Sequence, residues 1–246
     1  MNSVFRKQFD ITAIHLDRFG RTKPSVLLHF AQEAAGGHCM ELGMDWQTLA
    51  KRNLFWAVMR QKMQILRLPT EGETVYVETW PMPTTRSAFP RATVGYDAQG
   101  NPLFRVIGLW VLMDRVSRVM VLPGKSGIDL TGTVRGGELS VPGSIVPKML
   151  EHSVSRKVGY TELDQNGHVN NARYLDWIDD LLPSEFHKDH PMQAFTICYL
   201  SEAREADNID LHWQVLEDGC LQVEGYRTRT DVCEKNNRVF SGQVFF

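Results

Sequence analysis

The stretch YTELDQNGHVNNARYLDW, Tyr160–Trp177, carries the most informative pattern of the chain. In it Asp164, Asn166 and His168 occur at every second residue, and an amphipathic helical pattern follows from Asn170. Alternate side chains of an extended backbone share one face, so the three polar groups are predicted to converge just ahead of a helix. The start of a helix presents free N–H groups and a partial positive charge. A carboxylate, an amide and an imidazole in this setting favour acyl chemistry, in which negative charge develops on a carbonyl oxygen.

The composition predicts a soluble globular protein. The chain has 246 residues, of which 43% are hydrophobic, and a formal net charge of −2. This length allows one large domain or two small ones. The balanced charge argues against nucleic acid or an anionic membrane as a partner. No apolar run is long enough to cross a bilayer, and the start, MNSVFRKQFDIT, lacks the apolar core of a signal peptide.

The cysteines point to a reducing compartment. Four cysteines are present, and none of them is in a CxxC spacing. Neither a zinc site nor a redox pair is therefore predicted. We expect free thiols, a cytoplasmic protein, and no metal or other cofactor.

Hydrophobic periodicity predicts two helices and a series of strands. Pro24 suits the first turn of a helix, and apolar residues recur at helical spacing until about Leu42, where Gly43 ends the run. The second helix follows Asn170, and Pro183 stops it. Glycine and proline are frequent between 124 and 150, which predicts a linker. The predicted strands are 3–12, 54–66, 74–80, 88–96, 103–113, 118–122, 152–160, 194–202, 209–217, 220–230 and 239–246.

The two halves of the chain repeat each other. LDRFGRT at 16–22 aligns with LDQNGHV at 163–169, and both halves are predicted to contain a strand, a helix and then several antiparallel strands. We therefore expect an N-terminal module at 1–123, a linker at 124–150 and a C-terminal module at 151–246. Asn166 and His168 stand where the first copy has Phe19 and Arg21, so the polar chemistry is predicted only in the second module.

The first predicted helix is rich in small residues. It contains AQEAAGG at 31–37, and small side chains leave room beside a helix. This helix is expected to line an apolar cavity, and His38 is expected to be a core or cavity-wall residue and not a catalyst.

With these motifs, the sequence resembles the acyl-ACP thioesterase family of fatty acyl–acyl carrier protein hydrolases. LDQNGHVNNARYLDWI is similar to the D-x-N-x-H-V-N-N signature of that family, and FAQEAAGGH, NLFWAVMRQKMQILRLPTEGETVYVETW and GLWVLMDRVSR match in the first half. The resemblance implies an α+β fold of two tandem hot-dog modules, each an antiparallel sheet wrapped around one long helix. It also implies hydrolysis of acyl-ACP to free fatty acid and holo-ACP in fatty acid biosynthesis, with the acyl chain held in the first module.

The resemblance extends to the run YLSEAREAD at 199–207. Plant members carry Y-R-R-E-C-G-R-D there, so the glutamate is retained as Glu202, whereas Ala203 occupies the cysteine position. A Cys–His–Asn mechanism is thereby excluded at that position, and Cys198 is expected only to pack in a strand. The implied catalytic residues are Asp164, Asn166, His168 and Glu202.

Two chemical routes are open to these residues. In one, Glu202 and His168 deprotonate a water, Asp164 orients the imidazole, and Asn166 with nearby N–H groups stabilises the oxyanion. In the other, the carboxylate of Asp164 attacks and forms an anhydride that water then breaks. Asp164 and Asn166 could also serve only as turn and cap residues, and Glu202 could lie on the surface of an edge strand.

Other functions and partners remain open at this level. The alternatives are an acyl-CoA thioesterase, a hydratase or dehydratase, and a non-catalytic acyl-binding protein. Because two fused modules already supply the pairing of single hot dogs, both a monomer and a homodimer are compatible with the sequence. An acidic carrier protein would need basic residues at its docking surface, for which the candidates are Arg204, Arg227, Arg229, Lys235 and Arg238.

Overall fold

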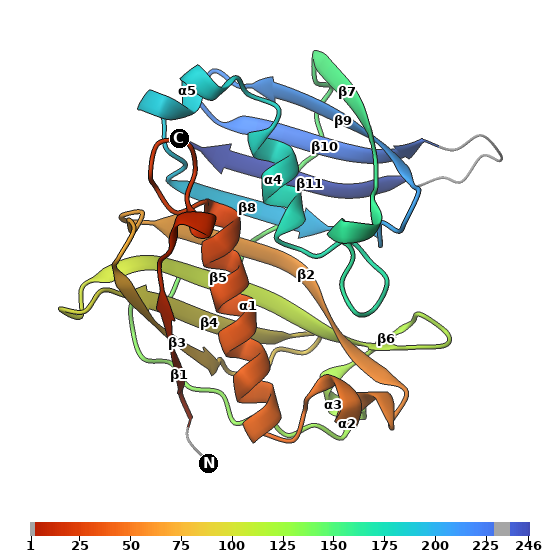
Figure 1. Ribbon diagram of the computed structural model, residues 1–246. Coiled ribbons are helices and arrows are strands. Elements are labelled where there is room, and N and C mark those ends of the chain that lie inside the picture. Colours follow the sequence, from red (N-terminus) through yellow and green to blue (C-terminus); the bar gives the residue numbers. More distant parts are fainter. Residues whose placement is uncertain (1–2, 229–236) are drawn as a thin grey trace. The chain divides into compact units, whose positions relative to one another are not determined.

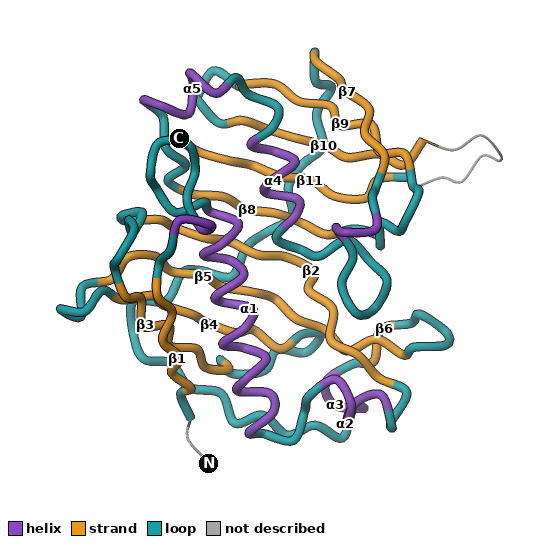
Figure 2. Tube along the Cα trace, viewed as in Figure 1, coloured by secondary structure: helices purple, strands orange, loops and turns teal. Residues whose placement is uncertain are grey.

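A computed structural model describes residues 3–228 and 237–246 of the chain. Arg229 and Lys235 therefore lie outside the described residues. The chain divides into two compact units, Met1–Pro142 and Gly143–Phe246, whose elements are shown in Figures 1 and 2. Within each unit, neighbouring strands pair in an antiparallel manner.

The sheet of the first unit has the strand order β1-β3-β4-β5-β2, and every neighbouring pair is antiparallel. A short strand, β6, pairs with β5. In Figure 2, α1 lies across one face of this sheet. The helices and strands are β1 (Phe5–Asp10), the 3-10 turn η1 (Ala13–His15), α1 (Pro24–Glu41), α2 (Trp46–Ala50), β2 (Leu54–Ile65), β3 (Thr74–Pro81), β4 (Phe89–Tyr96), β5 (Pro102–Asp114), β6 (Met120–Val121) and α3 (Pro123–Ser126).

Helix α1 forms where the sequence predicts it. Pro24 occupies its first turn, and Gly43, with a φ of +66°, follows the helix end at Glu41. A glycine tolerates this left-handed conformation without steric cost. The apolar face of the helix is buried, and each large side chain there contributes about 1.5–3 kcal/mol of hydrophobic stabilisation. The buried residues are Pro24, Ser25, Leu27, Leu28, Phe30, Ala31, Ala34, Ala35 and His38.

The sheet of the second unit repeats this arrangement with the order β7-β9-β10-β11-β8. Its helix α4 covers only 7 residues, so the long helix predicted up to Pro183 is shortened here, and a separate helix, α5, follows that proline. Helix α4 buries Trp177 against Phe240 of β11. The elements are β7 (His152–Lys157), η2 (Tyr160–Glu162), α4 (Arg173–Asp179), α5 (Ser184–Asp189), β8 (Ala194–Tyr199), β9 (Asn208–Val215), β10 (Leu221–Thr228) and β11 (Arg238–Phe245).

The duplication inferred from the sequence is present in the elements themselves. The strands β1 and β7 start at residues 5 and 152, and the turns η1 and η2 start at residues 13 and 160. Both pairs are separated by the offset of 147 that aligns LDRFGRT with LDQNGHV. Each unit also has a register shift next to a Gly-Tyr pair, at Gly95 in β4 and at Gly225 in β10. Each of these glycines faces a phenylalanine on the next strand, Phe104 or Phe240.

Alanine at Gly225 is expected to destabilise the second unit. An added Cβ would lie closer than 3.0 Å to the Phe240 ring, which is itself buried against Tyr174 and Trp177 of α4. Because that ring has no room to move, we expect Gly225→Ala to lower the free energy of unfolding by about 1–3 kcal/mol. Urea denaturation measures this change. Gly36→Ala is the matched control, since a Cβ there meets nothing within 4 Å, and it should stabilise the helix by about 0.5–1 kcal/mol.

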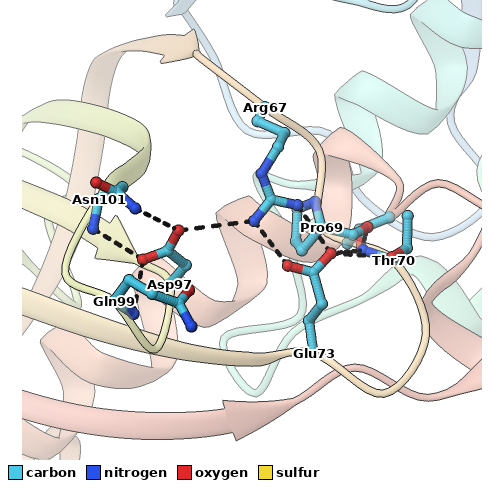
Figure 3. Close-up of polar contacts among 8 residues, drawn as sticks. Arg67, Pro69, Thr70, Glu73, Asp97, Gln99 and Asn101 are labelled. Carbon is cyan, nitrogen blue, oxygen red and sulfur yellow. Dashed lines mark hydrogen bonds and ion pairs between the residues drawn. The ribbon is translucent and has the colours of Figure 1, made fainter.

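A carboxylate cluster in the first unit makes its stability depend on pH (Figure 3). Nη1 and Nη2 of Arg67 donate to the Glu73 carboxylate at 2.8 and 2.7 Å, and the backbone N–H of Thr70 donates to the same carboxylate at 2.7 Å. The Arg67 hydrogen bond is the largest of the contacts that lower the pKa of Glu73 to about 2.

Because the folded-state pKa of Glu73 is depressed, its contribution to stability is present above the ordinary glutamate pKa and is lost as pH falls toward 2. We expect Glu73→Gln to remove about 1 kcal/mol of unfolding free energy near pH 6 and to make less difference near pH 2. Denaturation of both proteins at the two pH values measures this. Equal differences at both pH values would contradict the assignment.

Candidate active site

The residues Asp164 to His168 form a tight loop and not the extended segment that their alternation predicted. The N–H of Asp164 donates to the carbonyl of His168 at 2.7 Å, and the N–H of Gly167 donates back to the carbonyl of Asp164 at 3.0 Å. Gly167 has a φ of +75°. The Asp164 carboxylate closes the loop from inside, because its Oδ1 accepts the N–H groups of Asn166 at 2.8 Å and of His168 at 3.3 Å. These local hydrogen bonds override the two-residue period.

The first unit contains the same loop without the imidazole. Oδ1 of Asp17 accepts the N–H groups of Phe19 at 2.8 Å and of Arg21 at 3.0 Å, and Gly20 has a φ of +76°. Here the side chain of Arg21 turns back and places its Nε 3.1 Å from Oδ2 of Asp17. A third loop of this kind, closed by Asp97, is visible in Figure 3. The recurrence identifies the aspartate as a structural element of the loop, to which the second copy adds the side chains of Asn166 and His168.

His168 and Glu202 are brought together in the second unit. Nε2 of His168 lies 3.0 Å from Oε2 of Glu202, and the two side chains are 12% and 30% exposed. The pair is therefore sheltered and still reachable by solvent. Glu202 does not lie in a strand as predicted, because β8 ends at Tyr199 and Glu202 belongs to the following loop. The N–H of Val169 donates to the carbonyl of Ala203 at 2.9 Å, which joins this loop to the one that carries His168.

Two arginines hold the Glu202 loop. Nη2 of Arg204 donates to Oε2 of Glu202 at 2.8 Å from an exposed position. The Arg227 guanidinium donates to the backbone carbonyl of Glu202, and its Nε donates to Asp207 at 2.9 Å. Asp207 also accepts the N–H of Arg204 at 2.9 Å. Of the basic residues considered for docking, Arg227 thus supports the loop from inside the unit.

The polar residues behind the His168 loop were not singled out from the sequence. The carboxylate of Glu162 accepts the indole N–H of Trp177 at 2.7 Å and the N–H of Gly159 at 2.8 Å. It also pairs with Arg156, whose guanidinium lies 4.2 Å from the centre of the Trp177 ring. The only sequence signal for this support was the position of Glu162 directly before the motif. Asn170 acts as a turn residue, since its Oδ1 accepts the N–H of Ala172 at 3.0 Å.

The first unit contains a small pocket between α1 and the strands of its sheet. Ala31 and Ala35 line it, as the small-residue pattern predicted, but the pocket is not apolar. The buried side chains of Gln61, Arg91 and Thr93 also line it. The small residues of α1 do not all create space: a Cβ on Gly37 would lie 2.6 Å from the Phe5 ring.

Three further observations concern the cysteines, metal binding and membrane spans. Cys39, Cys198 and Cys220 are free thiols. Within residues 3–228 and 237–246, no cluster of histidine, cysteine and acidic side chains is arranged to hold a metal ion. Over the same residues, no helix is both long and apolar enough to cross a membrane.

In each unit a helix lies on one face of antiparallel strands, and this is the arrangement of a hot-dog module. The chain is therefore a tandem hot-dog protein, and its acid–imidazole pair lies in the second unit. Residues 2–122 match the family description "Acyl-ACP thioesterase N-terminal domain", and residues 148–240 match "Acyl-ACP thioesterase C-terminal domain". The chain belongs to the acyl-ACP thioesterase family.

Relatives and solved structures agree with this assignment. The chain is 26% identical over 217 residues to the palmitoyl-acyl carrier protein thioesterase of Gossypium hirsutum, covering 81% of this chain and 52% of that protein. It is 28% identical over 215 residues to the dodecanoyl-[acyl-carrier-protein] hydrolase of Cinnamomum camphora, covering 81% and 56%. The chain thus spans about half the length of these chloroplastic relatives.

The fold matches over its whole length. A crystal structure of an acyl-ACP thioesterase from Bacteroides thetaiotaomicron has a TM-score of 0.87 at 23% identity and covers 99% of this chain and 97% of that one. The 12:0-ACP thioesterase of Umbellularia californica has a TM-score of 0.82 at 23% identity, with coverage of 100% and 97%. These similarities confirm the predicted fold class of two tandem hot-dog modules.

Proposed function

We propose that this protein hydrolyses the thioester of fatty acyl-acyl carrier protein and releases free fatty acid and holo-ACP. The observation that carries the proposal is the 3.0 Å contact between His168 Nε2 and Glu202 Oε2. This contact occurs only in the copy that holds the D-x-N-x-H pattern, whereas the equivalent loop of the first copy closes with Arg21. The names of the plant relatives, which are acyl-ACP hydrolases, support the same substrate class.

In the proposed mechanism Glu202 and His168 together orient a water and take its proton. The water oxygen attacks the thioester carbon, the C–S bond breaks, and the proton passes to the departing thiolate. Asn166 and neighbouring backbone N–H groups stabilise the oxyanion that forms in between. One such donor typically lowers the barrier by about 3 kcal/mol.

Asp164 has a supporting role in this mechanism. Its Oδ1 already accepts two backbone N–H groups, and its Oδ2 lies 3.5 Å from the side-chain nitrogen of Asn166. A carboxylate engaged in this way is a poor nucleophile, since attack would give up these charge-assisted hydrogen bonds. The geometry therefore favours the water route over an anhydride at Asp164. Asp164 positions Asn166 and His168 by shaping the loop that carries them.

The acyl chain is proposed to bind in the first unit, beside the small residues of α1, and the carrier protein is proposed as the macromolecular partner. Of the three docking candidates that the structure describes, Arg204 is the most exposed. The free thiols Cys39, Cys198 and Cys220 are compatible with a cytoplasmic location. We propose no cofactor, and a monomer or homodimer as the assembly.

The substrate assignment is tested by measuring free-thiol release from acyl-ACP and from acyl-CoA of several chain lengths, side by side, with His168→Ala as the control. We expect release from acyl-ACP by the wild-type protein and little above background by the variant. Faster release from acyl-CoA would reassign the protein as an acyl-CoA thioesterase. Tight binding of acyl chains without thiol release from either substrate would make it a binding protein.

A further inference from the structure

A buried polar cluster lies on the side of the first sheet that faces α1. Nη1 of Arg91 lies 3.1 Å from Nδ1 of His38 on the helix and 3.3 Å from Oγ1 of Thr79 on β3. The hydroxyl of Thr93 donates to that of Thr79 at 2.9 Å. Arg91 is only 8% exposed and His38 only 1%. This cluster lies in the unit that lacks the acid–imidazole pair, and the proposed hydrolysis does not use it.

The buried guanidinium of Arg91 is contacted by a histidine and a threonine. Among residues 3–228 and 237–246, its hydrogen bonds go to Nδ1 of His38 and Oγ1 of Thr79, and no carboxylate is paired with it. Burial lowers the pKa of Arg91, an effect that the nearby Cys39 thiol partly opposes. A cation buried without a counter-charge is costly unless an acceptor satisfies its remaining donors. The contacts with His38 and Thr79 both come from Nη1, and a guanidinium carries further N–H donors that an incoming acceptor can engage.

The lining of the pocket also includes a residue with an unmet donor. Gln32 and Arg91 both line the pocket between α1 and the sheet. The Nε2 of Gln32 is buried and has no hydrogen-bond partner among the described residues. The free volume of the pocket is about 10 Å³, which is room for roughly one water-sized group. A space of this size, lined by Gln32 and Arg91 as donors, has room for a single oxygen acceptor.

We propose that this pocket recognises an oxygen substituent, a hydroxyl or an oxo group, on the acyl chain of the substrate. The inference rests on the proposed function, because it assumes that the acyl chain lies along α1. The apolar part of the lining, which includes Ala31, Ala35 and Val106, is suited to hydrocarbon, and Gln61 and Thr93 add further polar groups. A chain with an oxygen at the right carbon satisfies the donors of Arg91 and Gln32. An unsubstituted chain leaves them unpaired or must retain a water there.

The test compares acyl-ACP substrates of one chain length that carry a hydroxyl near the carboxyl end, in mid-chain or at the terminal carbon, or carry none. For the wild-type protein we expect kcat/KM to be about tenfold higher for one hydroxylated chain than for the plain chain. Gln32→Leu should bring this ratio close to one by replacing the amide donor with an apolar group. Gln64→Leu is the control, because Gln64 is exposed on β2, and it should keep the wild-type ratio.

Equilibrium binding of the matching free hydroxy and plain fatty acids provides a second readout that does not need turnover. If the protein releases no thiol from any substrate but still prefers the hydroxy acid in a Gln32-dependent manner, the proposed function fails and the site stands. Equal kcat/KM and equal binding for all members of the panel would overturn the site. So would a wild-type preference that Gln32→Leu leaves unchanged, since the pocket would then hold only a structural water.

Discussion

Glu202→Gln is expected to lower kcat/KM for acyl-ACP hydrolysis about 10³-fold, within the range of a lost general base. The substitution keeps the shape of the side chain and its hydrogen bonding to Arg204, but it removes the carboxylate that lies 3.0 Å from His168. The loss should therefore appear mainly in kcat, because the residue acts on the reacting water and not on the acyl chain. Initial rates of thiol release over a range of acyl-ACP concentrations measure it.

Glu205→Gln is the matched control for this prediction. Glu205 lies in the same loop, three residues further on, and is exposed. Its substitution removes one negative charge from the same neighbourhood and should change kcat/KM by less than about threefold. Comparable losses in both variants would show that the loop needs negative charge in general and would remove Glu202 from its assigned role.

The duplicated loop gives a second strong prediction, in which the same substitution has different consequences in the two copies. Both Asp17 and Asp164 close their loops by accepting two backbone N–H groups. Replacing either with alanine should lower the free energy of unfolding by about 2 kcal/mol, since those donors lose a charged acceptor. Asp164→Ala should in addition reduce hydrolysis about 10²-fold or more, because Asn166 and His168 lose their positions. Asp17→Ala should retain activity within a few-fold.

Parallel denaturation curves and rate measurements on both variants separate the two effects. If Asp17→Ala abolishes hydrolysis as completely as Asp164→Ala, the chemistry depends on the fold as a whole and is not confined to the second copy. If Asp164→Ala is stable and fully active, the loop does not position the catalytic side chains.

Most of the fold could be predicted from the sequence, because the patterns that indicate it are periodic or repeated. The helix beginning at Pro24 shows one continuous apolar face, and the LD…G repeat carries its offset into β1, β7, η1 and η2. The second helix was predicted too long. The apolar spacing continues to Leu182, but α4 ends at Asp179, and the N–H of Leu182 donates to the carbonyl of Asp179 in a turn.

The conformation of the site was harder to predict from the sequence, because local hydrogen bonds determine it. Alternating polar residues suggested a strand, yet an Asx turn and a glycine with positive φ fold Asp164–His168 into a loop. Nor does a pattern of small residues reveal polar groups on facing strands. The predicted apolar cavity therefore turned out to be lined in part by Arg91, which comes from β4, far from α1 in the sequence.

The attack of water on the thioester carbon is tested most directly by a single turnover in water enriched in the heavy oxygen isotope, with enzyme in excess over acyl-ACP. The released fatty acid and the peptide that contains Asp164 are then analysed by mass spectrometry. Activation of water by Glu202 and His168 predicts one heavy oxygen in the fatty acid and none in the protein. An anhydride opened at its acyl carbon would label the fatty acid in the same way, so the turnover is repeated with hydroxylamine present, and no hydroxamate is expected at Asp164. A hydroxamate at Asp164, or a fatty acid with only normal oxygen together with a labelled carboxyl at Asp164, would contradict this account and establish an anhydride intermediate.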